Sequence, residues 1–425
     1  MQISAVQAMA GRLLGESNAG RFSFEIKEPE TPGEKTWFEL APHATDGAAL
    51  IRGTSGVELG AGMGHYLRHV ANVSFSWPGT GGTSFGGAAR ELPRLSATSS
   101  EARRFVRSAK WLNTWNVCTF SYSFVWWSFE RWQKEIDLMA LFGVNLPLAY
   151  VGQEAVVRAL YAKAPYNLTN ADLSAFFSGP AWLTWQRSQG LRGWGGPLPT
   201  SWIDDHEVLQ RKILTAMRSI GMTPVLPAFG GWVPTALMRL YPHANISRVG
   251  KPPLCATGTL GDQYGCPAMV DAVDPLFQQL GRGWMQQLNE TYGTEDHMFG
   301  ADGFFSTIHA PWATLGTEES RAAAQFSQDA VSAQSFELLM NQPPEWWAAH
   351  AKGAYQAMAI SDPQAVWVYQ TYPWHQFIYY HKAVPGGGDA LNLTRSLSKA
   401  WTSAVPKGKL LLLDLWADAG LSISL

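Results

Sequence analysis

The chain of 425 residues contains little charge and few cysteines. Lys, Arg, Asp and Glu make up 16% of it, and a formal net charge of −2 gives no support for nucleic-acid binding. No apolar run is long enough to span a bilayer. The N-terminus has no apolar core with a cleavage site, so we see no signal peptide. Nucleic acid and membrane are therefore not expected as partners.

Several cofactor and catalytic motifs are also absent. No His/Cys spacing indicates a zinc site, no G-x-G-x-x-G turn follows a strand, and neither a P-loop nor a G-x-S-x-G elbow occurs. We therefore expect no cofactor and no metal. Of the three cysteines, Cys255 and Cys266 flank a Gly-rich loop and are either a disulfide or two free thiols. Cys118 is by default a buried, inert thiol.

Apolar and aromatic residues dominate what is present. Hydrophobic residues reach 46% and there are 20 tryptophans, which indicates a large core in a chain long enough for two domains. Most of the tryptophans are expected in that core. Those beside Gly in loops are suited to stack on sugar rings or other flat apolar ligands. Five Asn-x-Ser/Thr sequons favour the secretory route; they begin at Asn72, Asn167, Asn245, Asn289 and Asn392.

The first part of the chain, residues 1–92, is predicted to be a small α/β domain. The expected helices are 5–14 and 57–70, and the expected strands are 21–26, 37–40 and 48–53. A Gly/Pro/Ser-rich stretch at 77–87 separates this domain from the rest.

From residue 103 onward, strands alternate with helices. The six expected strands are 116–120, 144–149, 222–229, 296–302, 365–370 and 409–414. This alternation predicts a parallel sheet, and long loops at one end favour a (β/α)8 barrel over a doubly wound sheet. Because the chain stops just after the sixth strand, we expect an incomplete, C-terminally truncated barrel over residues 103–425.

Acidic side chains recur where the predicted strands end. They are Glu154, Asp302, Glu337, Asp414 and Asp418. In a barrel, a pair of such carboxylates suggests glycoside hydrolysis, although helix capping or an ion pair explains any single one equally well.

Several longer motifs make the interpretation specific. The run NVCTFSYSFVWW, the following RWQKEIDLMALFGVNLPLAYVGQEAV, and the later GPLPTSW, MRSIGMTPVLPAFGG, YGTEDHMFGAD and KLLLLDLWAD occur in order over residues 105–418. Together they resemble the α-N-acetylglucosaminidases of glycoside hydrolase family 89. The segment GRLLGESNAGRFSFEI resembles the small domain that precedes the barrel in that family.

The resemblance implies a retaining exo-hydrolase that removes terminal α-linked N-acetylglucosamine from glycans, notably heparan sulfate. In a retaining enzyme, the acid/base and the nucleophile are carboxyl groups about 5–5.5 Å apart. The sequence positions that match the family's sugar pocket, together with the acid at the end of the fourth strand, are Asn116, Cys118, Gln153, Glu154, Trp194, Asp302, Tyr372 and Trp374.

The two catalytic positions depart from the family pattern. The acid/base motif is split by an atypical insertion at about 305–335; a gapped alignment makes Glu337 the acid/base, whereas an ungapped one places Ser306 there. At the nucleophile position, Asp418 stands where the family has Glu. Asp is one methylene shorter, and a displacement of about 1 Å can cost ~10²-fold in rate.

We therefore expect an α-N-acetylglucosaminidase-like glycosidase with Glu337 as acid/base and Asp418 as nucleophile. The alternative is a non-catalytic sugar-binding remnant or an inactive fragment. A glycan with terminal N-acetylglucosamine is the expected partner, and the resemblance and sequons predict a lysosomal or secreted protein. The sequence does not indicate the oligomeric state.

Overall fold

The computed structural model describes residues 1–28, 31, 34–43, 48–76, 91–95, 103–115, 117–177, 179, 198–248, 268–301, 342–370 and 390–413. The chain forms two compact units. Unit 1 consists of Met1–Trp115, Trp127–Ala149 and Arg211–Pro224, and unit 2 of Asn116–Trp126, Tyr150–Gln210 and Val225–Leu425.

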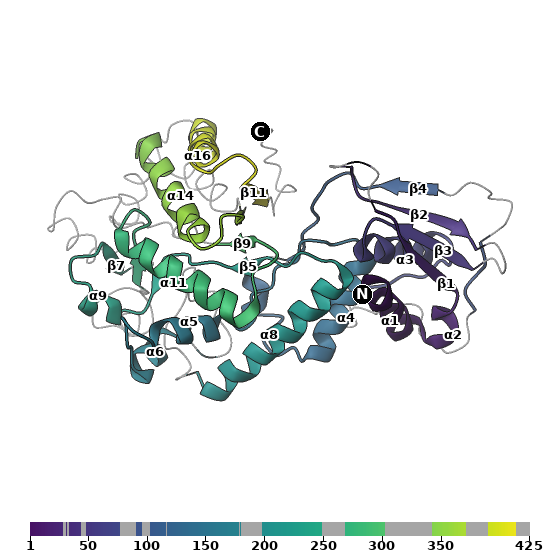
Figure 1. Cartoon of the computed structure of the whole chain (residues 1–425), viewed down its shortest axis with the longest axis horizontal. Coiled ribbons are helices and arrows are strands. Elements are labelled where there is room, and N and C mark those ends of the chain that lie inside the picture. The colour runs from purple at the N-terminus through teal and green to yellow at the C-terminus, as the bar shows by residue number, and fades with distance from the viewer. Residues whose placement is uncertain are drawn as a thin grey trace. The chain divides into compact units, whose positions relative to one another are not determined.

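A four-stranded mixed sheet forms the centre of unit 1 (Figure 1). Its strands are β1 (Phe22–Ile26), β2 (Trp37–Pro42), β3 (Ala49–Gly53) and β4 (Arg103–Val106). They lie in the order β1-β3-β2-β4; β1 and β3 are parallel, whereas β2 pairs antiparallel with both β3 and β4. β4 was not predicted, and it follows the Gly/Pro/Ser-rich stretch in the sequence. The domain boundaries at 92 and 103 stay a prediction.

The helices α1 (Gln2–Leu14) and α3 (Gly56–His69) contact this sheet. Unit 1 also contains α2 (Glu16–Ala19), α4 (Phe129–Leu141) and the last part of α8 (Thr200–Ile220). α3 packs on the sheet and against α4, and its side facing other helices is a stripe of glycines four residues apart. A Cβ on Gly60 would lie 2.9 Å from the carbonyl oxygen of Ala140, and Cβ atoms on Gly56 and Gly64 would overlap other backbone carbonyls. This close packing therefore depends on the missing side chains.

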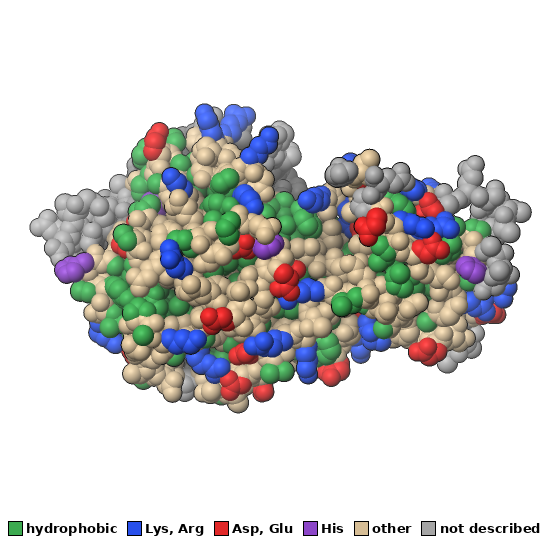
Figure 2. Space-filling model, in the orientation of Figure 1, with side chains coloured by type: hydrophobic (Ala, Val, Ile, Leu, Met, Phe, Trp, Pro, Cys, Tyr) green, Lys and Arg blue, Asp and Glu red, His purple; other side chains and the backbone are tan. Residues whose placement is uncertain are grey.

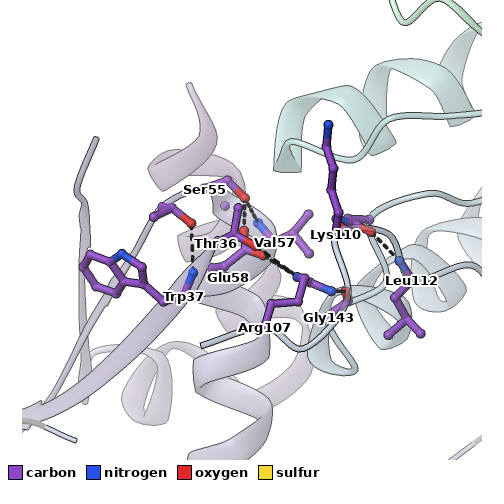
Figure 3. A network of polar contacts seen from close by, with 12 residues as sticks. Thr36, Trp37, Ser55, Val57, Glu58, Arg107, Lys110, Leu112 and Gly143 are labelled. Carbon is purple, nitrogen blue, oxygen red and sulfur yellow. Dashed lines mark hydrogen bonds and ion pairs between the residues drawn. The ribbon is translucent and has the colours of Figure 1, made fainter. Parts of the chain in front are cut away.

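An ion pair joins Arg107, the residue directly after β4, to Glu58 of α3 (Figure 3). Arg107 donates from Nη2 to Oε1 of the buried Glu58 at 2.6 Å and from Nη1 to the carbonyl oxygen of Gly143 at 2.8 Å. Its Nε also faces the Thr36 hydroxyl at 3.2 Å. Because every contact is charge-assisted or part-buried, the network fixes the sheet, α3 and the end of α4 to one another.

Asp137 and His65 are among the titratable side chains of unit 1 whose surroundings shift their pKa. Arg12 forms a bidentate pair with the buried Asp137, from Nε at 2.9 Å and from Nη2 at 2.7 Å. Burial nevertheless raises the pKa of the Asp137 carboxyl, and the hydrogen bond from Arg12 opposes that effect. On α3, the His65 ring lies 4.2 Å from the Phe105 ring and 4.4 Å from the His69 ring, between centroids.

Unit 2 contains a sheet of four described strands that are all parallel. They are β5 (Leu226–Pro227), β9 (Met298–Gly300), β10 (Val366–Gln370) and β11 (Leu410–Leu413), in the order β11-β10-β9-β5. A helix precedes each of the last three: α11 (Pro275–Tyr292), α14 (Pro344–Ala359) and α16 (Ala390–Ala404). This is the predicted alternation of helix and parallel strand, and Figure 1 shows these helices beside the strands.

The rest of unit 2 is built from short elements. They are the 3-10 helix η2 (Val117–Ser121), the helices α5 (Gln153–Tyr161), α6 (Asn170–Phe176) and α9 (Ala236–Leu240), and a small antiparallel sheet of β6 (Trp232–Val233), β8 (Ala268–Val270) and β7 (Ile246–Arg248). The helix α14 is held beside this sheet, because the buried His350 places Nε2 2.8 Å from the Asp271 carboxylate.

Three strand predictions are corrected by the structure. The run over 116–120 is wrong in its described part, which forms η2: the Thr119 carbonyl accepts from the backbone N–H groups of Tyr122 and Phe124, at 3.2 and 3.0 Å. Residues 144–149 form no strand and contain one isolated bridge residue, Leu148. The run over 222–229 is reduced to β5.

Surface charge is mixed. Figure 2 shows Lys, Arg, Asp and Glu side chains interspersed over the described part of this face. Within the described ranges, no helix combines the length and the apolar character needed to cross a membrane.

Candidate functional site

A small pocket with an enclosed volume of about 30 Å³ lies in unit 2 at the beginning of α5. Its lining combines aromatic rings with two polar side chains from the first turn of that helix. The lining residues are Phe120, Phe124, Val125, Tyr150, Val151, Gly152, Gln153, Glu154, Trp202, His206 and Leu209. Apolar walls with a few polar groups are typical of a small-molecule site.

Gln153 and Glu154 are the polar groups of this pocket. They are the first two residues of α5, and their exposed fractions are 6% and 3%. A carboxylate in the first turn of a helix is stabilised by the partial positive charge of the helix N-terminus. The site therefore offers an amide and a carboxylate in largely buried positions, as recognition of hydroxyl and N–H groups requires.

Gly152 determines where α5 begins. Its φ of 68° and ψ of 17° are left-handed, which glycine adopts without strain. The Tyr292 hydroxyl donates a buried hydrogen bond of 2.7 Å to the Gly152 carbonyl. A Cβ at this position would lie 2.5 Å from the Tyr292 hydroxyl oxygen and 2.7 Å from the His206 carbonyl oxygen. Tyr292 and His206 therefore leave no room for a side chain directly before Gln153.

Tyr150 relates the pocket to the parallel sheet. A Cβ on Gly300, the last residue of β9, would overlap the Tyr150 hydroxyl, so this hydroxyl lies at the carboxyl end of that strand. The Tyr150 ring stacks on Phe120, with centroids 5.5 Å apart. In barrels with alternating strands and helices, active sites occupy the carboxyl end of the sheet. The pocket lies at that end.

Trp202 and His206, on the first turns of α8, form another wall. Their rings stack with centroids 3.9 Å apart, and His206 Nδ1 lies 3.0 Å from the Trp202 carbonyl oxygen. Neither residue is selected from the sequence, because both fall within an amphipathic helix pattern or next to it. The sequence feature that could have pointed to Trp202 is its place at the end of the Gly/Pro-rich motif GPLPTSW.

The structure places only some of the predicted site residues. Gln153 and Glu154 lie side by side in the pocket, and the backbone of Cys118 lies in η2 close to Phe120 in the sequence. The other predicted residues lie outside the described residues: Asn116, Trp194, Asp302, Glu337, Tyr372, Trp374, Asp418, the pair Cys255 and Cys266, and the insertion at 305–335. Among the described residues, no group of three His, Cys, Asp or Glu side chains comes together as a metal site would need.

A small α/β domain, followed by parallel strands that alternate with helices and have a pocket at their carboxyl end, is the arrangement typical of (β/α)-barrel proteins. Family models extend this result. Residues 113–423 match "Alpha-N-acetylglucosaminidase (NAGLU) tim-barrel domain", and residues 4–94 match the N-terminal domain of the same family. The chain belongs to the alpha-N-acetylglucosaminidase family. The resemblance and the two-part fold class predicted from the sequence are thereby confirmed.

Two similar proteins illustrate the family. The chain is 34% identical to human alpha-N-acetylglucosaminidase over 422 residues, which are 98% of this chain and 48% of the human protein. The chain thus spans about half the length of this relative. A family 89 glycoside hydrolase from Clostridium perfringens, solved with 2-acetamido-1,2-dideoxynojirmycin, superposes with a TM-score of 0.72. The identity is 23%, over 98% of this chain and 39% of that one, so this similarity concerns the fold.

Proposed function

We propose that this chain carries the sugar-binding and bond-breaking groups of a retaining glycoside hydrolase that removes terminal α-linked N-acetylglucosamine. The observation that carries the proposal is membership of the alpha-N-acetylglucosaminidase family along nearly the whole chain. The Clostridium protein gives further support, because a variant of it with two Glu to Gln substitutions was solved with its substrate, GlcNAc-alpha-1,4-galactose.

The proposed mechanism uses two carboxyl groups. Glu337 donates a proton to the oxygen of the leaving sugar while Asp418 attacks the anomeric carbon and forms a glycosyl-enzyme ester. Water, activated by the ionised Glu337, then attacks the same carbon and releases both N-acetylglucosamine and the Asp418 carboxylate. Two inversions retain the α configuration.

The described pocket would hold the terminal sugar. Gln153 and Glu154 supply hydrogen-bond partners for hydroxyl and acetamido groups, and the surrounding rings provide apolar contact with the sugar's C–H face. We propose that Asn116, Cys118, Trp194, Asp302, Tyr372 and Trp374 complete this binding site.

Hydrolysis of 4-nitrophenyl N-acetyl-α-glucosaminide tests the reaction, and NMR of the first product formed tests retention. We expect Glu337→Gln to reduce kcat/KM strongly, whereas Glu345→Gln, at an exposed position on α14, serves as the matched control. Activity that survives Glu337→Gln would sink the assignment of the acid/base. Binding of N-acetylglucosamine without turnover would instead support the non-catalytic sugar-binding protein.

The nucleophile allows a test in the opposite direction. Asp418→Glu adds the methylene that the family carries at this position, and we expect kcat/KM to rise by up to about 10²-fold. No gain in this variant, with the fold retained by circular dichroism, would remove Asp418 from the mechanism.

Heparan sulfate as the natural glycan and a lysosomal or secreted location are further proposals. Three of the five sequon asparagines, Asn72, Asn167 and Asn289, are exposed, as glycan acceptors must be. A shift in mass after treatment with peptide N-glycosidase of the protein secreted from a eukaryotic host would test this route.

A further inference from the structure

Two histidines lie about one turn apart on α3, in unit 1. They are His65 and His69, and the centroids of their rings are 4.4 Å apart with an interplanar angle of 43°. Residues four apart are neighbours on a helix surface, and two histidines at this spacing on one face can bind the same metal ion. This pair therefore has the spacing of a metal site with two protein ligands.

Aromatic rings hold His65 in place, whereas His69 is open to solvent. The His65 ring packs against Phe105 of β4, with centroids 4.2 Å apart, and against Phe38 of β2, with centroids 5.7 Å apart. His65 is half-buried and His69 is exposed. A metal ion can therefore approach from the side of His69, and one of its two ligands is already fixed, which lowers the entropic cost of binding.

The nitrogen atoms of both imidazoles are available to a ligand. Among the residues that the structure describes, His65 and His69 form ring contacts but no hydrogen bond. A neutral imidazole carries one acceptor nitrogen, which is the atom that binds a metal. Two such nitrogens therefore lie close together without a competing partner in the described part of the chain.

The separation of the two rings indicates which metal fits. With metal–nitrogen distances of about 2.0–2.1 Å, a metal lies roughly 3.2 Å from each ring centroid, so centroids are about 4.5 Å apart for ligands at a right angle and about 5.2 Å apart for tetrahedral ligands. The observed 4.4 Å matches the right angle. Tetragonal sites with nitrogen and oxygen ligands are typical of Cu²⁺ and Ni²⁺, whereas Zn²⁺ prefers a tetrahedron.

Positive charge near the pair narrows the choice further. Arg68 directly precedes His69, and the Arg103 guanidinium lies 4.9 Å from the centroid of the Phe105 ring, which contacts His65. These charges oppose any bound cation. A site with two protein ligands and opposing charge favours the ion with the strongest affinity for imidazole, and Cu²⁺ has the highest affinity among the divalent first-row metals.

We propose that His65 and His69 form a Cu²⁺ site on the surface of unit 1. Each imidazole supplies one nitrogen, the two nitrogens are neighbours in a square-planar arrangement, and water fills the remaining positions. No group of three His, Cys, Asp or Glu side chains comes together in the described ranges, so this site is open and exchanges its metal. The inference does not depend on the proposed function.

The test is a titration of the full chain, expressed without a histidine tag, with Cu²⁺. Competition with a colorimetric chelator gives the affinity, and electron paramagnetic resonance at half an equivalent of Cu²⁺ gives the number of bound nitrogens. We expect two nitrogens in the wild type. His69→Ala should weaken binding at least about tenfold, since loss of even an outer-shell partner costs about 10–100-fold in metal affinity. His65→Phe, which keeps a ring against Phe105, should have the same effect.

His243→Ala is the matched control, because His243 is exposed and has no second histidine within four residues of it. We expect its Cu²⁺ affinity to equal that of the wild type. Equal affinity in His69→Ala and the wild type, an equal loss in His243→Ala, or a spectrum with one nitrogen would overturn the site. If His65→Phe does not fold, His69→Ala, at an exposed position, decides alone. Tighter binding of Zn²⁺ than of Cu²⁺ would overturn the choice of metal.

Discussion

Replacement of Gly152 by alanine adds only one methyl group, but it should disturb the candidate site strongly. The backbone there has φ 68° and ψ 17°, and holding an L-residue in the left-handed region costs about 1–2 kcal/mol. The new Cβ would also lie 2.7 Å from the His206 carbonyl oxygen and 3.0 Å from its carbon. Both are backbone atoms that cannot turn aside, and such overpacking costs about 1–3 kcal/mol more.

We therefore expect Gly152→Ala to lower the free energy of unfolding of unit 2 by about 2–5 kcal/mol. Urea denaturation followed by circular dichroism measures this loss. Gly408→Ala is the matched control: its φ of 81° is also left-handed, but no atom lies within 4 Å of the added Cβ. That control should lose only about 1–2 kcal/mol. Equal losses in the two variants would refute the steric part of the reasoning.

A functional consequence accompanies the loss of stability. Because α5 begins directly after Gly152, any backbone shift that relieves the contact moves Gln153 and Glu154. We expect sugar binding by Gly152→Ala to be weaker than by Gly408→Ala when both are measured well below their unfolding temperatures. Unimpaired binding in Gly152→Ala would mean that the pocket tolerates the shift.

Three further predictions concern unit 1. Burial raises the pKa of Asp137 above its ordinary 3.8, so the folded state keeps the carboxyl proton to higher pH than the unfolded chain does. The free energy of unfolding should therefore fall as the pH rises from 3.8 through the folded-state pKa, and Asp137→Asn should remove this fall in urea denaturation measured at a series of pH values. Desolvation, assisted by nearby positive charge, lowers the pKa of His65 from 6.5 to about 4, so stability should be lost as pH falls across that range, and His65→Phe should abolish this loss in the same series. Gly64→Ala should lower the free energy of unfolding by about 1–3 kcal/mol, measured by thermal unfolding. Gly11→Ala in α1 meets only the flexible side chain of Glu16 and should raise the free energy of unfolding by about 0.5–1 kcal/mol; equal effects would show that α3 can move away.

Helices were easier to predict from the sequence than strands. The long amphipathic patterns of α8 and α11 identify their elements, because each buries one continuous face. The run that contains Val117 has the apolar, β-branched composition of a strand, but its buried rings pack on each other: Phe120 meets both Phe124 and Tyr150. That packing is tertiary, and local composition does not contain it.

Only some of the residues that line the pocket were selected from the sequence, because others depend on tertiary packing. Gln153 and Glu154 were selected because they match a family motif, and they lie together in the pocket. Trp202 and His206 were not selected, since their positions on α8 are explained equally well by helix packing. Only the fold brings the beginning of α8 against the beginning of α5. The roles of Glu337 and Asp418 stay predictions.

The glycine stripe of α3 has a consequence for mutation. At Gly56, Gly60 and Gly64, the atom nearest to an added Cβ is a backbone carbonyl oxygen, an arrangement in which Cα–H groups approach carbonyl oxygens. Every other amino acid adds a Cβ there, and any base change in the first or second position of a glycine codon either adds a side chain or ends the chain. These three codons therefore tolerate no missense change without a steric cost. In a library of random variants selected for folding, we expect them to remain glycine even though they lie far along the sequence from the residues proposed for chemistry.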